Sequence, residues 1–164
     1  MNDLLLRVLE VVLSGVSPEP LEDKVVSFEK LPAECAVVYD ADIRKFRQAT
    51  STEVISVDLD GDKVNELLIF NGENGSGGEG WTVMQKIAGK YRKTGEVFGL
   101  LYKSGNGLIV KSPCGWDNAD WDYYELVNGK LVLKFNIDIK YRKPVRQEVA
   151  SIKIKVKNES GFTK

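Results

Sequence analysis

Beyond residue 52 the chain alternates apolar and polar positions with the period of two that is typical of β-strands. Short segments rich in Gly, Asn and Ser interrupt this alternation and predict turns between antiparallel strands. The strongest turn signal is Asn128-Gly129, because Asn-Gly suits the type I′ turn of a hairpin. The predicted hairpins are 81–87 with 91–98, 100–102 with 108–111, and 123–127 with 131–139.

The last predicted strand, residues 150–156, alternates more strictly than the others. Ile152, Ile154 and Val156 fall on one face, and lysines occupy the positions between them. We expect the apolar face to be buried and the lysine face to be solvated, at an edge of the sheet where lysines oppose aggregation.

A helix, not a strand, is predicted for residues 2–14. The segment is rich in Leu and Val, and its polar residues recur at spacings of four, three and four, which places them on one narrow stripe of a helix. Gly15 follows the segment and ends it. A signal peptide would begin with basic residues, and this segment does not.

The order of these elements predicts an α+β fold in a single domain, residues 1–164. Its main part, residues 52–157, is an antiparallel β meander that forms an open or partly closed twisted sheet, with the N-terminal helix packed on it. Residues 21–50 are less clear: 35–39 is either a strand or the start of a helix, and 40–48 fits a short surface helix.

An acidic segment between two predicted strands has the composition of a cation-binding loop. Asp58, Asp60 and Asp62 alternate around Gly61, and Glu66 closes the segment. Ca²⁺ takes about six to eight oxygen ligands in a flexible shell, which alternate side chains of a tight turn can supply. The predicted ligands are Asp58, Asp60, Asp62, the carbonyl of Val64, and Glu66. The alternative is an acidic turn that binds nothing, in which the carboxylates would repel one another without a cation.

Two features exclude an EF-hand: Ile69 stands at the twelfth position, where that loop needs Glu, and the flanking segments are strands. Residues of about 54–85 instead resemble the calcium loop of FG-GAP and VCBS repeats, which has aspartates at its first, third and fifth positions, an acid at its ninth, and an apolar strand after it. The sequence departs from that pattern at Lys63, where glycine is usual, and at Glu66, where Asp is commoner. The resemblance implies a calcium-binding β module of an exported bacterial protein, present here in one copy.

Composition excludes several classes of function. The chain has 164 residues with 43% hydrophobic and 29% charged residues, which is typical of one globular domain. A net charge of −1 gives no electrostatic case for nucleic acid, and no apolar segment is long enough to span a membrane. Histidine is absent, which excludes Ser-His-Asp and Cys-His catalysis in their usual form.

The cysteines and the loop bear on localisation. Cys35 and Cys114 either form a disulfide or remain thiols, and their spacing does not decide between the two. A calcium loop of this kind is useful where calcium is near millimolar. We therefore expect a periplasmic or extracellular protein, with the cytoplasm as the alternative.

A run of aromatic and acidic residues from Trp116 to Glu125 has the composition of a binding surface. In the alternative reading its aromatics belong to the core of the sheet. A strand would send Trp121 and Tyr123 to one face and Asp122 and Tyr124 to the other, so we expect at least one aromatic to remain exposed. The predicted partner-binding residues are Trp116, Asp117, Asp120, Trp121 and Tyr124.

Together these features predict a non-enzymatic calcium-binding module that recognises a protein or a glycan through its loops. One alternative is an inhibitor or immunity protein that blocks an enzyme with the acidic aromatic run. A less favoured one is a small glycoside hydrolase that uses a pair of carboxylates, drawn from Glu73, Glu79, Asp117 and Asp120.

Overall fold

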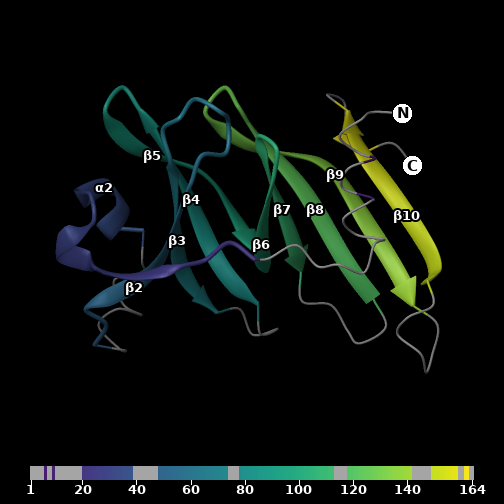
Figure 1. Cartoon of the computed structure of the whole chain (residues 1–164), viewed down its shortest axis with the longest axis horizontal. Coiled ribbons are helices and arrows are strands. Elements are labelled where there is room, and N and C mark those ends of the chain that lie inside the picture. Colours follow the sequence, from purple (N-terminus) through teal and green to yellow (C-terminus); the bar gives the residue numbers. More distant parts are fainter. Residues whose placement is uncertain are drawn as a thin grey trace.

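The computed structural model describes residues 6, 9, 20–38, 48–73, 78–112, 118–141, 149–158 and 161–162. Within these residues the protein is mainly antiparallel β, arranged as two open sheets with very little helix (Figure 1). The first sheet has the strand order β1-β2-β3-β4-β5 and the second the order β11-β10-β9-β8-β7-β6, so within each sheet the strands pair with their neighbours in sequence.

The strands of the first sheet are β1 (Lys24–Ser27), β2 (Ser51–Val57), β3 (Glu66–Glu73), β4 (Glu79–Ile87) and β5 (Lys90–Phe98). Those of the second sheet are β6 (Leu100–Ser104), β7 (Gly107–Ser112), β8 (Asn118–Val127), β9 (Lys130–Tyr141), β10 (Val149–Asn158) and β11 (Gly161–Phe162). A 3₁₀ turn, η1 (Phe28–Lys30), and one short helix, α2 (Ala33–Ala36), lie between β1 and β2.

The chain passes from one sheet to the other at Gly99, between β5 and β6. This glycine has a φ of 135°, which L side chains rarely adopt, and a Cβ added there would overlap the carbonyl oxygen of Lys111. Its N–H donates to the carbonyl oxygen of Glu79, 2.9 Å away. Glycine is therefore required where the meander changes sheet.

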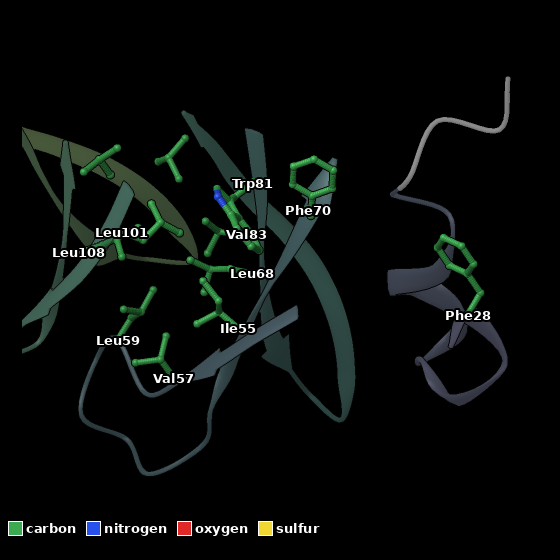
Figure 2. Packing of buried hydrophobic residues seen from close by; sticks show 12 residues of the cluster. Phe28, Ile55, Val57, Leu59, Leu68, Phe70, Trp81, Val83, Leu101 and Leu108 are labelled. Carbon is green, nitrogen blue, oxygen red and sulfur yellow. The ribbon is translucent and has the colours of Figure 1, made fainter. Parts of the chain in front are cut away.

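The largest hydrophobic cluster lies between the two sheets (Figure 2). Strand alternation puts Ile55, Leu68 and Val83 of the first sheet on the same side as Leu101 and Leu108 of the second. The facing surfaces of the sheets therefore share one core.

A smaller cluster covers the outer face of the first sheet. Cys35 of α2 is fully buried there against Ile69 of β3 and Met84 of β4. Because Leu68 contributes to the inner cluster and Ile69 to the outer one, β3 is buried on both faces. This explains the continuous apolar run of residues 67–70, which lacks the usual alternation.

The third cluster lies on the outer face of the second sheet, where Tyr123 stacks on Phe135 with ring centroids 4.9 Å apart. Of the predicted helix 2–14, the structure describes only Leu6 and Leu9, both with helical backbone, and Leu9 packs against this cluster. The other residues of that prediction, and residues 40–47 of the surface helix expected over 40–48, lie outside the described residues. No described helix has the length and hydropathy that crossing a membrane would need.

The three predicted hairpins are confirmed, and the Asn128-Gly129 turn has the positive φ angles, 51° and 72°, of a type I′ turn. Residues 35–36 belong to a helix. Two expectations are corrected. The meander forms two sheets instead of one, because it changes sheet at Gly99. The apolar face of β10 is not buried: Ile152, Ile154 and Val156 are 36%, 39% and 41% exposed, since they lie beyond the packed centre of the outer cluster.

Candidate metal centre

The acidic loop joins β2 to β3 and brings three carboxylates together. Ligand oxygens of Asp58, Asp60 and Glu66 lie within 4.8 Å of one another. Leu59, between the two aspartates, points the other way into the inter-sheet core and is 1% exposed (Figure 2). The buried leucine therefore anchors the loop and directs both neighbouring carboxylates towards the cluster.

Glu66 is the buried member of the cluster, with 1% of its surface exposed. Its Oε2 accepts a hydrogen bond of 2.7 Å from the backbone N–H of Leu59. Burial raises the pKa of Glu66 to about 7, and the charges of Asp60 and Asp62 act in the same direction, whereas the Leu59 hydrogen bond lowers it. A buried carboxylate facing two others is costly without a positive charge.

Asp58 shapes the turn with its side chain. Its Oδ1 accepts the N–H of Gly61 at 2.7 Å and its Oδ2 accepts the N–H of Lys63 at 3.2 Å. The Gly61 bond, helped by the Lys63 bond and the charge of Lys103, lowers the pKa of Asp58. Asp58 is therefore ionised at neutral pH.

The other two predicted ligands are placed differently. Asp62 lies outside the three-carboxylate cluster, and its Oδ1 accepts the N–H of Val64 at 2.7 Å. The side chain of Val64 is 40% exposed, as expected if only its backbone serves the loop. Lys63 adopts a φ of 69°, a left-handed conformation that glycine takes more readily than other residues.

Gln85 of β4 also reaches the cluster, although it was not among the residues predicted from the sequence. Its Nε2 donates a hydrogen bond of 2.7 Å to Oδ2 of Asp60, 25 residues earlier in the chain. The signal was strand alternation, since Trp81 and Val83 precede Gln85 at steps of two on the inner face of β4. The partner strand could not be read from the sequence.

The second sheet also contacts the loop. A Cβ added at Gly61 would lie 2.7 Å from Nδ2 of Asn106, in the turn between β6 and β7. The charge of Lys103 on β6 also acts on Asp58, so the loop, which joins two strands of the first sheet, interacts with the second sheet as well.

The donor set fits a hard cation. Carboxylate and amide oxygens are the ligands that Ca²⁺ and Mg²⁺ prefer. One polar atom beside the site is orphaned: Oε1 of Gln85 is buried and has no hydrogen-bond donor among the described residues, although it is the Nε2 of the same amide that contacts Asp60. A buried acceptor without a donor costs about 1–3 kcal/mol, which a nearby cation would offset.

The predicted partner-binding run is only partly described. Trp116 and Asp117 lie outside the described residues. Trp121 is 5% exposed, with its ring 5.7 Å from that of Tyr102 and the Nζ of Lys111 5.1 Å from its centroid. Trp121, a predicted partner-binding residue, is therefore a core residue, because strand alternation sends it with Tyr123 into the outer cluster.

Tyr124 and the acids of β8 form a partly buried polar group on the opposite face. The amide Nδ2 of Asn136 lies 2.7 Å from Oδ1 of Asp120 and 2.8 Å from Oδ1 of Asp122. Burial raises the pKa of Asp122, and the charge of Asp120 raises it further. The Tyr124 hydroxyl donates to Asp122 at 3.4 Å, and burial raises the pKa of Tyr124 to about 12.

Cys35 carries a free thiol that is 0% exposed. Burial raises its pKa to about 11, so it is unreactive at neutral pH. Of the two alternatives, Cys35 therefore takes the thiol form, and Cys114 lies outside the described residues.

Comparison with known proteins gives one fold-level likeness. No family model matches the sequence, and no curated protein matches it. The fold is similar to that of a Xanthomonas type IV secretion system related protein, with a TM-score of 0.50 and 24% identity over 67% of this chain. The match spans 56% of that protein, so the chain corresponds to little more than half its length.

Proposed function

We propose that this chain is a non-enzymatic, calcium-binding β module. The observation that carries the proposal is the convergence of Asp58, Asp60 and the buried Glu66, whose ligand oxygens lie within 4.8 Å. Calcium is favoured over magnesium because it accepts more oxygen ligands in less regular geometry, as a loop with one exposed side provides. The resemblance to FG-GAP and VCBS loops supports the same ion.

The proposed ligands include those expected from the sequence. Asp58, Asp60 and Glu66 supply carboxylate oxygens, and Val64 supplies its carbonyl oxygen. The hydrogen bond from the N–H of Val64 uses Oδ1 of Asp62, so we assign Oδ2 of Asp62 to the ion. The cation would offset the burial, and the lesser repulsion by Asp60 and Asp62, that raise the pKa of Glu66. It would also hold β2, β3 and the loop between them in one arrangement.

Isothermal titration with calcium tests the site. Wild-type protein should take up one ion, and Asp60→Ala should lose this uptake. Glu29→Ala removes an exposed carboxylate of η1 as a matched control and should bind as wild type does. Absence of uptake by the wild type, or equal uptake by Asp60→Ala, would overturn the proposal.

We also propose a protein partner and a periplasmic or extracellular location. The support is the fold-level likeness to a secretion-related protein, since secretion systems are assemblies of proteins, and the calcium concentration that such a loop requires. Trp116, Asp117, Asp120 and Tyr124 remain the proposed contact residues, and an inhibitor or immunity role is one form of this proposal. Calcium-dependent cross-linking to a partner by wild type and not by Trp116→Ala would support it. Equal cross-linking by both proteins would remove Trp116 from the surface.

A second candidate function is carboxylate-dependent glycoside hydrolysis. It is favoured by the Asp120 and Asp122 pair, which shares the Asn136 amide and in which Asp122 has a raised pKa. Turnover of a glycan substrate that is lost in both Asp120→Asn and Asp122→Asn would establish it. Turnover that survives both changes would exclude this pair.

A further inference from the structure

The amide of Gln85 lies between the acidic loop and the turn that joins β8 to β9. Its Nε2 donates to Oδ2 of Asp60 at 2.7 Å, and its Oε1 lies 3.9 Å from the position that a Cβ would take at Gly129. The nitrogen therefore faces the acidic cluster, while the oxygen faces the turn. That oxygen is buried and has no donor among the described residues.

The nitrogen of this amide therefore has a hydrogen-bond partner, whereas its oxygen has none among the described residues. Because the amide nitrogen and oxygen have nearly the same shape, a half-turn about the last side-chain torsion exchanges their positions without displacing neighbouring atoms. The half-turn would bring the orphaned oxygen to the cluster. Without a cation this is unfavourable, since Oε1 would face the carboxylate of Asp60.

A cation reverses that preference. With calcium on the carboxylates, Asp60 no longer needs the donor, and a neutral oxygen is a suitable further ligand for an ion that takes about six to eight. We propose that Gln85 is a further ligand of the cation site, supplied by β4, whose Oε1 turns to the ion when it binds. The inference rests on the proposed calcium site.

Terbium luminescence tests the coordination directly. Tb³⁺ replaces calcium in oxygen sites, and its decay times in H₂O and D₂O give the number of water molecules on the bound ion. Gln85→Met keeps the length of the side chain but removes the oxygen, so the bound ion should gain about one water, and calcium affinity should fall about tenfold. Gln85→Glu should keep the wild-type water count and bind calcium at least as tightly.

Two further variants serve as a second test of the Gln85 oxygen and as a control. Gln85→Asn keeps the amide but withdraws it by one methylene, so it should also gain a water if Gln85→Met does not fold. Asn71→Ala removes an amide of β3 that donates to the Thr82 hydroxyl at 2.9 Å, and it should leave the water count unchanged.

The outcomes separate this inference from the site itself. Unchanged water counts and affinities in Gln85→Met and Gln85→Asn, with a wild type that binds Tb³⁺, would overturn the role of Gln85 alone. A wild type that binds neither Tb³⁺ nor calcium would overturn the site and this ligand together. A weakened affinity without any gain of water would reduce Gln85 to a hydrogen-bond donor that positions Asp60, and would overturn its role as a ligand.

Discussion

The carboxylate of Glu66 accepts the backbone N–H of Leu59 at 2.7 Å, and both residues are 1% exposed. The ninth residue of the acidic loop is thereby tied to the second inside the protein. The carboxylate that closes the loop is also one that the proposed ion requires. The loop therefore cannot form in this way without burying the carboxylate of Glu66, which costs free energy when the group is charged.

Replacing Glu66 by Gln should separate these two roles. The amide oxygen can still accept the Leu59 N–H, while the buried charge is removed. We expect the calcium-free variant at pH 8 to be more stable than wild type by roughly 1 kcal/mol and to lose its stabilisation by calcium. Urea unfolding with chelator and with calcium measures both effects. A calcium-free variant less stable than wild type would show that the charged form of Glu66 is favourable in the fold.

The stability of the calcium-free protein should depend on pH through Glu66. Its folded pKa of about 7 exceeds the ordinary value of 4.5, so the folded state holds the proton more tightly. The free energy of unfolding should therefore fall as the pH rises from about 4.5 to 7 and then level off. Saturating calcium, or Glu66→Gln, should reduce this slope to the part that Asp122 contributes, since burial raises the pKa of that carboxyl as well. The lowered pKa of Asp58 acts at more acidic pH and does not interfere. An equal slope with and without calcium would contradict the prediction.

Calcium should stabilise the wild type in proportion to its occupancy. For a ~0.1 mM site, 1 mM calcium should add roughly 1.4 kcal/mol to the free energy of unfolding. Asp60→Ala should abolish this gain, and Glu29→Ala should keep it. Thermal melts at several calcium concentrations measure the effect, and a melting temperature that is the same in calcium and in chelator would speak against the ion.

Gly107→Ala should destabilise the protein although no metal ligand is touched. A Cβ at Gly107 would lie 2.6 Å from Cε2 of Tyr123, and that ring cannot move away because it is 1% exposed and stacked on Phe135. We expect a loss of about 1–3 kcal/mol by denaturant unfolding. Ser104→Ala, directly across the hairpin, is the control and should lose little. A loss no larger than that of the control would mean that the ring adjusts.

Trp121→Ala should lower stability by about 3–5 kcal/mol, as the truncation of a core aromatic does. Lys111→Ala removes the side chain whose ammonium lies above the same ring and should cost about 1 kcal/mol or less. Denaturant unfolding compares the two variants. If Trp121→Ala kept its stability, the indole would not be packed as described.

The positions of the strands and hairpins could be predicted from the sequence, but the way in which they assemble into sheets could not. The turns at residues 128–129 and 104–107 and the acidic loop followed from local residue chemistry. Alternation told which residues share a face, such as Trp121 with Tyr123, but not what that face packs against. The division into two sheets therefore escaped prediction, because local alternation does not show that β6 leaves β5 at Gly99 and pairs only with β7. Gln85 escaped for the same reason, since its contact with Asp60 spans 25 residues.

The neighbour-to-neighbour strand order has a consequence for how the protein folds. Both sheets pair consecutive strands, so their hairpins close short loops at low entropic cost. Each sheet can form from its own hairpins, and we expect the two sheets to dock around the shared core late in folding. The acidic loop, which belongs to the first sheet and rests on Asn106 of the second, is completed only at that step. Calcium uptake followed during refolding would therefore time the docking of the two sheets.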